Sequence, residues 1–185
     1  MDITNNNQLS NNELSVLALA NEYCRAIELC GSTQPEDFIN KMIKLLPRIY
    51  IAVTDLQNGN ATESFEFSFS STHLDEEYYN QICSNIAATM GSNDSYLETF
   101  HQDMKYSDSP IAATVSESLA DIFQVLYNFI EDVREASIEE ISEHLQLLRT
   151  DFTEYWSQIL CNVMCPLNEI VCGRGDDIND EMDFI

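Results

Sequence analysis

Apolar residues recur at intervals of three and four along most of this chain, which is the repeat of an α-helix that buries one face. The most regular run has apolar side chains at Val115, Leu119, Ile122, Leu126, Ile130 and Val133. A second run extends from Ile138 to Val163, and Pro166 should bend or end it because proline removes a backbone hydrogen bond. The pattern predicts two long helices, and Trp156 lies in the second, so we expect its indole to be buried.

Residues that cap helices mark where further helices begin and end. Three hydroxyl residues are followed three positions later by glutamate, which is the capping-box pattern: Ser10 with Glu13, Thr33 with Glu36, and Ser137 with Glu140. Gly31 and Gly91 stand where two helices should stop, because glycine accepts the left-handed conformation beyond a helix C-terminus. Together with their apolar stripes, these residues predict helices over residues 11–30, 34–53 and 75–90.

The remaining segments have weaker patterns. Pro47 should kink or break the second of these helices. Residues 56–71 form a polar linker in which 63–70 alternates with period two, and we expect a loop there because a lone strand has no sheet to join. Residues 95–105 are a short, less periodic stretch, and a turn is predicted at 107–110.

These elements predict an all-α fold, a single-domain antiparallel bundle of five or more helices joined by short loops. The chain contains only 5 Gly and 4 Pro in 185 residues, which disfavours the many tight turns of a β-sandwich or barrel. We expect the bundle to span residues 11–172, with a disordered or loosely ordered N-terminus at 1–10 and an acidic tail at 173–185.

Acidic residues dominate the charge, with 32 Asp and Glu against 8 Lys and Arg and a net charge of −24. Such a chain repels nucleic-acid phosphates and anionic lipid headgroups, so neither is an expected partner. No apolar run is long enough to cross a membrane, and the polar start of the sequence is unlike a secretory signal. We therefore expect a soluble cytoplasmic protein.

The six cysteines include no Cys-x-x-Cys pair, and a chain with this much apolar material does not need disulfides. Cys161 and Cys165 are four residues apart, so a helix would place them on one face, where two thiolates could bind a metal. The alternative is that both are small apolar residues of a core stripe. We favour the core stripe because free cysteine is among the most buried residue types.

Four short motifs occur in an order that is shared with a bacterial family. They are Leu-Leu-Pro-Arg-Ile-Tyr at residues 45–50, Asp-Ser-Tyr-Leu-Glu at 94–98, Ser-Leu-Ala-Asp-Ile-Phe at 118–123, and Tyr-Trp at 155–156. Through them the chain resembles a helical family known only as a domain of unknown function, frequent in Bacteroides-type bacteria and actinomycetes. Many members have histidine where this chain has Tyr155, so a proposal that needs that histidine would fail here. The resemblance implies an all-helical fold and brings no activity, cofactor or catalytic residue.

Three of the basic residues line one stripe of the predicted second helix. Lys41, Lys44 and Arg48 are spaced i, i+3 and i+7, which places them on one face. One interpretation is an anion or carboxylate site, in which the planar guanidinium of Arg48 offers two parallel hydrogen bonds. The other is that the stripe pairs with acidic helices of the same bundle. The sequence leaves both interpretations open.

Glu98 and His101 form a Glu-x-x-His pair, which di-iron bundles use on two of their helices. A site of that kind needs a second such pair, and neither His73 nor His144 has glutamate three residues before it. The two residues are therefore weak metal candidates, and we expect them at the surface or in packing. We expect no metal, no other cofactor and no catalytic residue.

Mostly acidic side chains are predicted to form a face of their own. On the two C-terminal helices they lie opposite or ahead of the apolar stripe, at Glu117, Asp121, Asn128, Asp132, Glu139, Glu140 and Glu143. A field of this sign attracts basic partners. We therefore expect a non-enzymatic acidic bundle that binds a basic macromolecule, in particular a protein with a basic surface. The alternative is a small-molecule or anion binder, or a metal-dependent enzyme.

Overall fold

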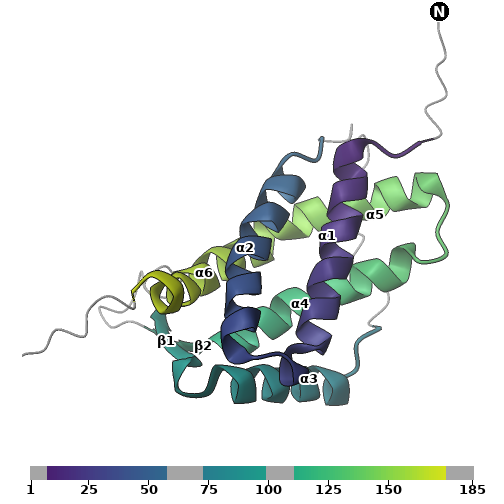
Figure 1. Cartoon of the computed structure of the whole chain (residues 1–185). Helices are drawn as coiled ribbons and strands as arrows, with labels where there is room; N and C mark the ends of the chain where they lie inside the picture. The colour runs from purple at the N-terminus through teal and green to yellow at the C-terminus, as the bar shows by residue number, and fades with distance from the viewer. Residues whose placement is uncertain (1–7, 58–72, 99–110, 174–185) are drawn as a thin grey trace, which may run out of the picture.

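The computed structural model describes residues 8–57, 73–98 and 111–173, and in this part of the chain it confirms the all-α prediction (Figure 1). The helices are α1 (Asn11–Glu28), α2 (Pro35–Thr54), α3 (Glu76–Met90), α4 (Val115–Val133), α5 (Ile138–Asp151) and α6 (Ser157–Cys172). Two short strands, β1 (Ser95–Glu98) and β2 (Ile111–Thr114), form an antiparallel pair between α3 and α4. The linker with the alternating residues 63–70 lies outside the described residues, as do most of the two predicted terminal tails.

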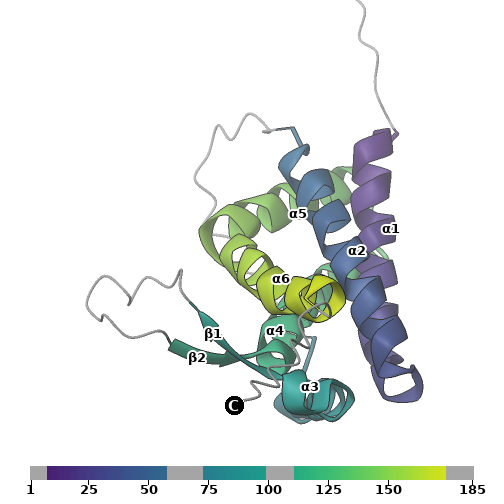
Figure 2. The ribbon, with the colours of Figure 1, turned by 60° about the vertical axis from the view of Figure 1, so that its left-hand side comes forward.

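Helix α4 lies in the middle of the molecule, and α1, α3, α5 and α6 pack against it. Its sequence explains this position, because apolar residues occupy most of its circumference rather than one narrow stripe. Helices α1 and α2 form an antiparallel pair that crosses the other helices (Figures 1 and 2). The hydroxyl of the buried Tyr23 on α1 donates to the carbonyl of Leu119 on α4 over 2.9 Å, so the two layers are joined by a hydrogen bond as well as by packing.

Polar contacts hold the C-terminal end of α2. The amide of Asn12 on α1 donates to the carbonyl of Ala52 over 3.0 Å. Arg149 on α5 donates to the carbonyl of Leu56, and Gln146 donates to that of Gln57 over 2.9 Å. Carbonyls at a helix C-terminus lack intrahelical partners, so these side chains satisfy groups that would otherwise need water.

Two of the three predicted capping boxes are confirmed, at Ser10 and Ser137. The third is wrong, because Pro35 occupies the first position of α2 and makes Gln34 the N-cap. Proline is favoured at this position since its fixed φ is already helical and its missing N–H is not needed. Thr33 instead donates its hydroxyl to the carbonyl of Leu29 over 2.9 Å.

The two internal prolines do not end their helices. Pro47 lies within an unbroken α2, and Pro166 within an α6 that continues to Cys172. The turn in the predicted C-terminal helix comes earlier, at the π-helical segment Phe152–Trp156 between α5 and α6 (Figure 2). Within this π turn the rings of Phe152 and Trp156 pack edge to face, with their centroids 4.5 Å apart. The tryptophan is fully buried, as the sequence predicts.

Candidate functional site

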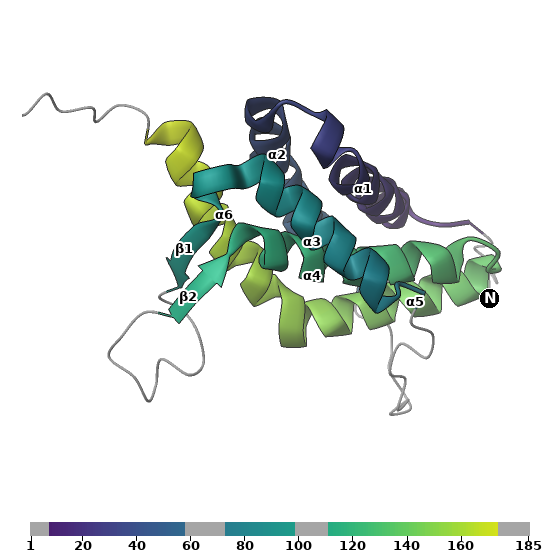
Figure 3. The same ribbon diagram turned by 90° about the horizontal axis from the view of Figure 1, so that it is seen from below.

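Exposed carboxylates are concentrated on the side of the molecule where three helix ends lie. The N-terminus of α3, the C-terminus of α4 and the N-terminus of α5 lie on the same side of the molecule (Figures 1 and 3). We call this surface the acidic end, and its exposed members are Asp75, Glu76, Glu77, Glu135, Glu139, Glu140 and Glu143. Carboxylates are favourable in the first turn of a helix because they face its positive dipole end. Two helix N-termini therefore stabilise a concentration of negative charge.

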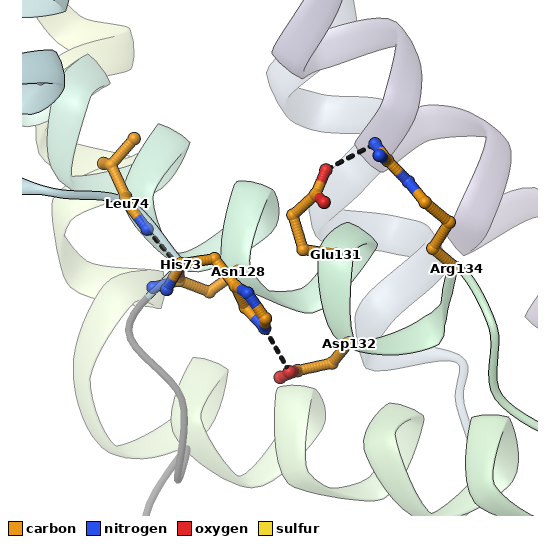
Figure 4. A network of polar contacts seen from close by, with 6 residues as sticks. All are labelled: His73, Leu74, Asn128, Glu131, Asp132 and Arg134. Atoms are coloured by element: carbon orange, nitrogen blue, oxygen red, sulfur yellow. Dashed lines mark hydrogen bonds and ion pairs between the residues drawn. The ribbon is translucent and has the colours of Figure 1, made fainter.

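Side chains of α4 fix the start of α3 beside this surface (Figure 4). The buried Asn128 accepts hydrogen bonds at its Oδ1 from the backbone N–H groups of His73 and Leu74, each over 3.0 Å. Asp132 lies 2.7 Å from Nε2 of His73. At the same end of α4, Glu131 forms an ion pair with Arg134. The start of α3 is thus held against the C-terminal part of α4 by hydrogen bonds and an ion pair.

The predicted acidic face of α4 is only partly a surface, which corrects the sequence interpretation. Asn128 is buried, and Asp121 is half-buried and accepts a hydrogen bond from the hydroxyl of Tyr79 over 2.7 Å. Burial raises the pKa of Asp121, and the nearby charge of Glu117 adds to the effect. Glu117 is exposed, but it lies fifteen residues before Asp132, about 22 Å along the helix. Part of the predicted face is buried because α4 has neighbours on almost every side.

The basic stripe lies on the exposed side of α2. Lys41, Lys44 and Arg48 are all exposed, and Arg48 forms an ion pair with Glu22 of α1 over 3.5 Å. The pair borders a shallow groove of about 400 Å³ between α1 and α2. Neither lysine has an ion pair within residues 8–57, 73–98 and 111–173. For Arg48 the structure therefore contains the internal pairing that the sequence left open, while the lysines extend into solvent.

The cysteine prediction is wrong for α6. Cys161 and Cys165 are exposed rather than part of a core stripe, and the buried cysteines are Cys24 and Cys30. The stripe of α6 that faces the core is instead Leu160, Val163 and Leu167, one position away. Partial burial raises the pKa of Cys161, and Cys165 adds to the effect, so the thiol stays protonated near neutral pH.

The structure describes only one of the two metal candidates. Glu98 lies at the end of β1 and accepts a hydrogen bond from Tyr96, whereas His101 lies outside the described residues. In the described part of the chain, no three His, Cys, Asp or Glu side chains are arranged to hold a metal ion.

A cleft of about 730 Å³ lies between β1 and α6, and no sequence pattern predicted it. One wall consists of Ser92 and Asn93, which precede β1, and of the four residues of β1. The other wall is one side of α6, with Asn162, Pro166, Glu169 and Ile170. We call it the β1–α6 groove. The four residues of each strand, Ser-Tyr-Leu-Glu and Ile-Ala-Ala-Thr, do not alternate between apolar and polar, so neither the strands nor the groove was expected.

Comparisons with known proteins give a fold and no activity. The model of a family described as a domain of unknown function (DUF5063) matches residues 7–172. The crystal structure of protein BF1032 from Bacteroides fragilis is similar with a TM-score of 0.73 and 26% sequence identity, over 87% of this chain and 92% of that chain. No curated protein matches the chain. Among the described helices, none is long and apolar enough to cross a membrane.

Proposed function

The chain belongs to the family described as a domain of unknown function (DUF5063), and we propose that it is a non-enzymatic protein that binds a basic region of another protein through the acidic end. The observation that carries the proposal is the concentration of exposed carboxylates at one end of the bundle. Arg134 is the basic residue that follows the same helix end, and it pairs with Glu131. The surface charge there is therefore strongly negative.

Two half-buried tyrosines beside the acidic end would add affinity for lysine or arginine. The rings of Tyr78 and Tyr127 lie 5.9 Å apart in an edge-to-face arrangement, and Tyr78 donates to Glu28 over 3.2 Å. Burial and the charge of Glu28 raise the pKa of Tyr78 to about 12, so its hydroxyl remains a neutral donor. A cation over a tyrosine ring gains about 0.5–1 kcal/mol at an exposed site. The patch would therefore favour a cationic side chain by charge and by ring contact.

The fixed position of the helix ends supports a binding role as well. Asn128 and Asp132 already hold the start of α3 against α4, so the carboxylates of the first turn of α3 need little rearrangement on binding. A preorganised surface loses less conformational entropy when a partner docks. The negative field would also accelerate the approach of a basic partner, with a rate that falls as salt screens the charge.

A charge-matched pair of variants tests the proposal with a fluorescein-labelled peptide of ten lysines, measured by fluorescence anisotropy. The first variant removes three charges from the acidic end, by Glu135→Gln, Glu139→Gln and Glu143→Gln. Each exposed charge pair contributes about 0.5 kcal/mol, so the loss of three charges should raise the Kd of the peptide about tenfold.

The control variant removes three exposed charges from other parts of the surface, by Asp37→Asn, Asp55→Asn and Glu154→Gln. It has the same net charge as the first variant and should bind nearly as well as the unmodified protein. Equal weakening by both variants would show that the peptide responds only to net charge, and the acidic end would then not be the binding site.

A further inference from the structure

We propose that the open edge of β1 binds an extended peptide segment that carries lysine or arginine, by adding it as a third strand in the β1–α6 groove. This surface is separate from the acidic end, and the mode of binding is different, because backbone hydrogen bonds would supply part of the affinity. The inference therefore does not rest on the function proposed above.

The pairing of β1 with β2 leaves regularly spaced backbone groups without a partner. The N–H of Val115 donates to the carbonyl of Asp94 over 2.7 Å, in register with the strand pair. Hydrogen-bonded and non-hydrogen-bonded pairs alternate along an antiparallel ladder, so Tyr96 forms hydrogen bonds with Ala113. The pairs on either side of it, Ser95 with Thr114 and Leu97 with Ala112, form no hydrogen bonds across the ladder. The N–H and C=O groups of Ser95 and Leu97 consequently point away from β2. No described residue satisfies them, and an added strand could.

The open edge faces α6 rather than bulk solvent alone. In Figures 2 and 3, β1 lies on the side of the strand pair that is nearer to α6, and β2 lies on the far side. Positions 162, 166, 169, 170 and 173 of the chain line the opposite wall of the groove, at the spacing of one helix face. A strand edge with a helix alongside is the arrangement in which several peptide-binding domains hold an extended ligand.

The side chains that line the groove select for a basic and partly apolar segment. Glu98 and Glu169 contribute carboxylates from opposite walls, and among the described residues that line the groove there is no lysine or arginine. Leu97 is 64% exposed, and Pro166 and Ile170 supply apolar surface across from it. Alternate side chains of an added strand point to opposite faces, so a lysine or arginine could alternate with an apolar residue.

The frame of the groove is held rigidly at its base. Asp94 accepts hydrogen bonds from the backbone N–H and the hydroxyl of Ser116, both over 2.8 Å. Tyr96 donates to Glu98 over 2.9 Å and lies 3.0 Å from the hydroxyl of Ser118. These contacts fix the strand pair to the N-terminus of α4, so the edge of β1 is presented in a defined place before any ligand arrives.

The test uses the full chain, labelled with ¹⁵N, and titrates it with the peptide acetyl-Lys-Val-Lys-Val-Lys-amide while amide resonances are followed by NMR. We expect saturable shifts at Ser95 and Leu97 and slower hydrogen exchange at both amides. The same peptide with every backbone nitrogen methylated keeps its charge and side chains but cannot pair, and should bind at least tenfold more weakly. Equal binding of the methylated peptide, or of a peptide with glutamate in place of lysine, would overturn the proposal.

Two proline variants localise the site. Leu97→Pro removes an N–H that points to the open edge, and proline is tolerated on a strand at such positions. Ala112 lies opposite Leu97 and directs its own N–H to the far edge of β2, so Ala112→Pro is the matched control. Binding should fall at least tenfold in Leu97→Pro and persist in Ala112→Pro, and the reverse would refute the assignment.

Further experiments distinguish the proposed peptide from other possible occupants of the groove. The acidic-end variant with Glu135, Glu139 and Glu143 changed to glutamine should bind this peptide as the unmodified protein does. This result keeps the two proposals distinguishable. A tenfold gain in affinity on truncation after Gly173 would assign the groove to the chain's own C-terminal segment and overturn the proposal. A dimer that Leu97→Pro abolishes would assign the edge to a second copy and would overturn it as well.

Discussion

Asn128 offers the sharpest test of how the start of α3 is held, because one side-chain oxygen serves two backbone donors. Replacing it with alanine leaves the N–H groups of His73 and Leu74 without this acceptor. The amide of Leu74 is buried, and an unsatisfied buried donor costs about 1–3 kcal/mol. The amide of His73 is partly buried, so water can compensate for some of its loss. We expect Asn128→Ala to lower the free energy of unfolding by about 3 kcal/mol.

Urea unfolding at neutral pH measures this change, and hydrogen exchange locates it. The amide of Leu74 should lose protection in the variant, while amides in the middle of α4 should change only with the global stability. Asn168→Ala is the control, since Asn168 is exposed on α6 and its removal should change stability by less than about 0.5 kcal/mol. A change below about 0.5 kcal/mol for Asn128→Ala, with unaltered exchange at Leu74, would refute this reasoning.

Four further predictions follow from burial and charge. Burial raises the pKa of Asp121 in the folded state above its value of about 4 in the unfolded chain. The protonated carboxyl therefore stabilises the fold at pH below about 4, and this stabilisation is lost as the pH rises and the buried group ionises. Asp121→Asn keeps an acceptor for Tyr79 and should be more stable than the unmodified protein at pH 7 but not near pH 3, as urea unfolding across pH would show. A difference in unfolding free energy that widens on acidification would contradict this. Trp156 should emit at the short wavelength of a buried indole, and emission typical of water-exposed indole would contradict its packing. The melting temperature should rise between very low salt and about 0.15 M sodium chloride because ions screen carboxylate repulsion, and a fall would mean that attractive pairs dominate. Arg48→Ala should cost less than about 1 kcal/mol, since its pair with Glu22 is exposed, and sulfate should shift the melting temperature of both forms equally; a shift seen only with Arg48 present would favour an anion site.

The helices could be predicted because each carries a long periodic stripe and a local start. The helix predicted over residues 115–133 has the bounds that the structure gives to α4, and the caps at Ser10 and Ser137 act within one turn of chain. Local rules failed where a neighbouring residue competed. Pro35 displaced the predicted cap at Thr33, and the π-helical segment Phe152–Trp156 took the bend that was expected at Pro166.

The candidate sites depend on contacts between distant parts of the chain, which periodicity does not contain. Glu139, Glu140 and Glu143 could be predicted as exposed from their place at a helix start. The place of the first turn of α3 on the same side of the molecule depends on the contact between Asp132 and His73, which are 59 residues apart. The exposure of Cys161 and Cys165 was missed because a shift of one position along a helix exchanges a core residue for a surface residue.

The association rate of the natural partner, measured against salt, shows whether the acidic end attracts a basic protein by charge. The tagged protein would capture its partner from the source organism, and stopped-flow mixing of the purified pair would follow association from low salt to about 0.3 M sodium chloride, where the screening length is well below 10 Å. We expect a basic partner whose association slows as salt rises, with a shallower slope for the variant that lacks the charges of Glu135, Glu139 and Glu143. An acidic partner that associates at the same rate at every salt concentration would contradict it.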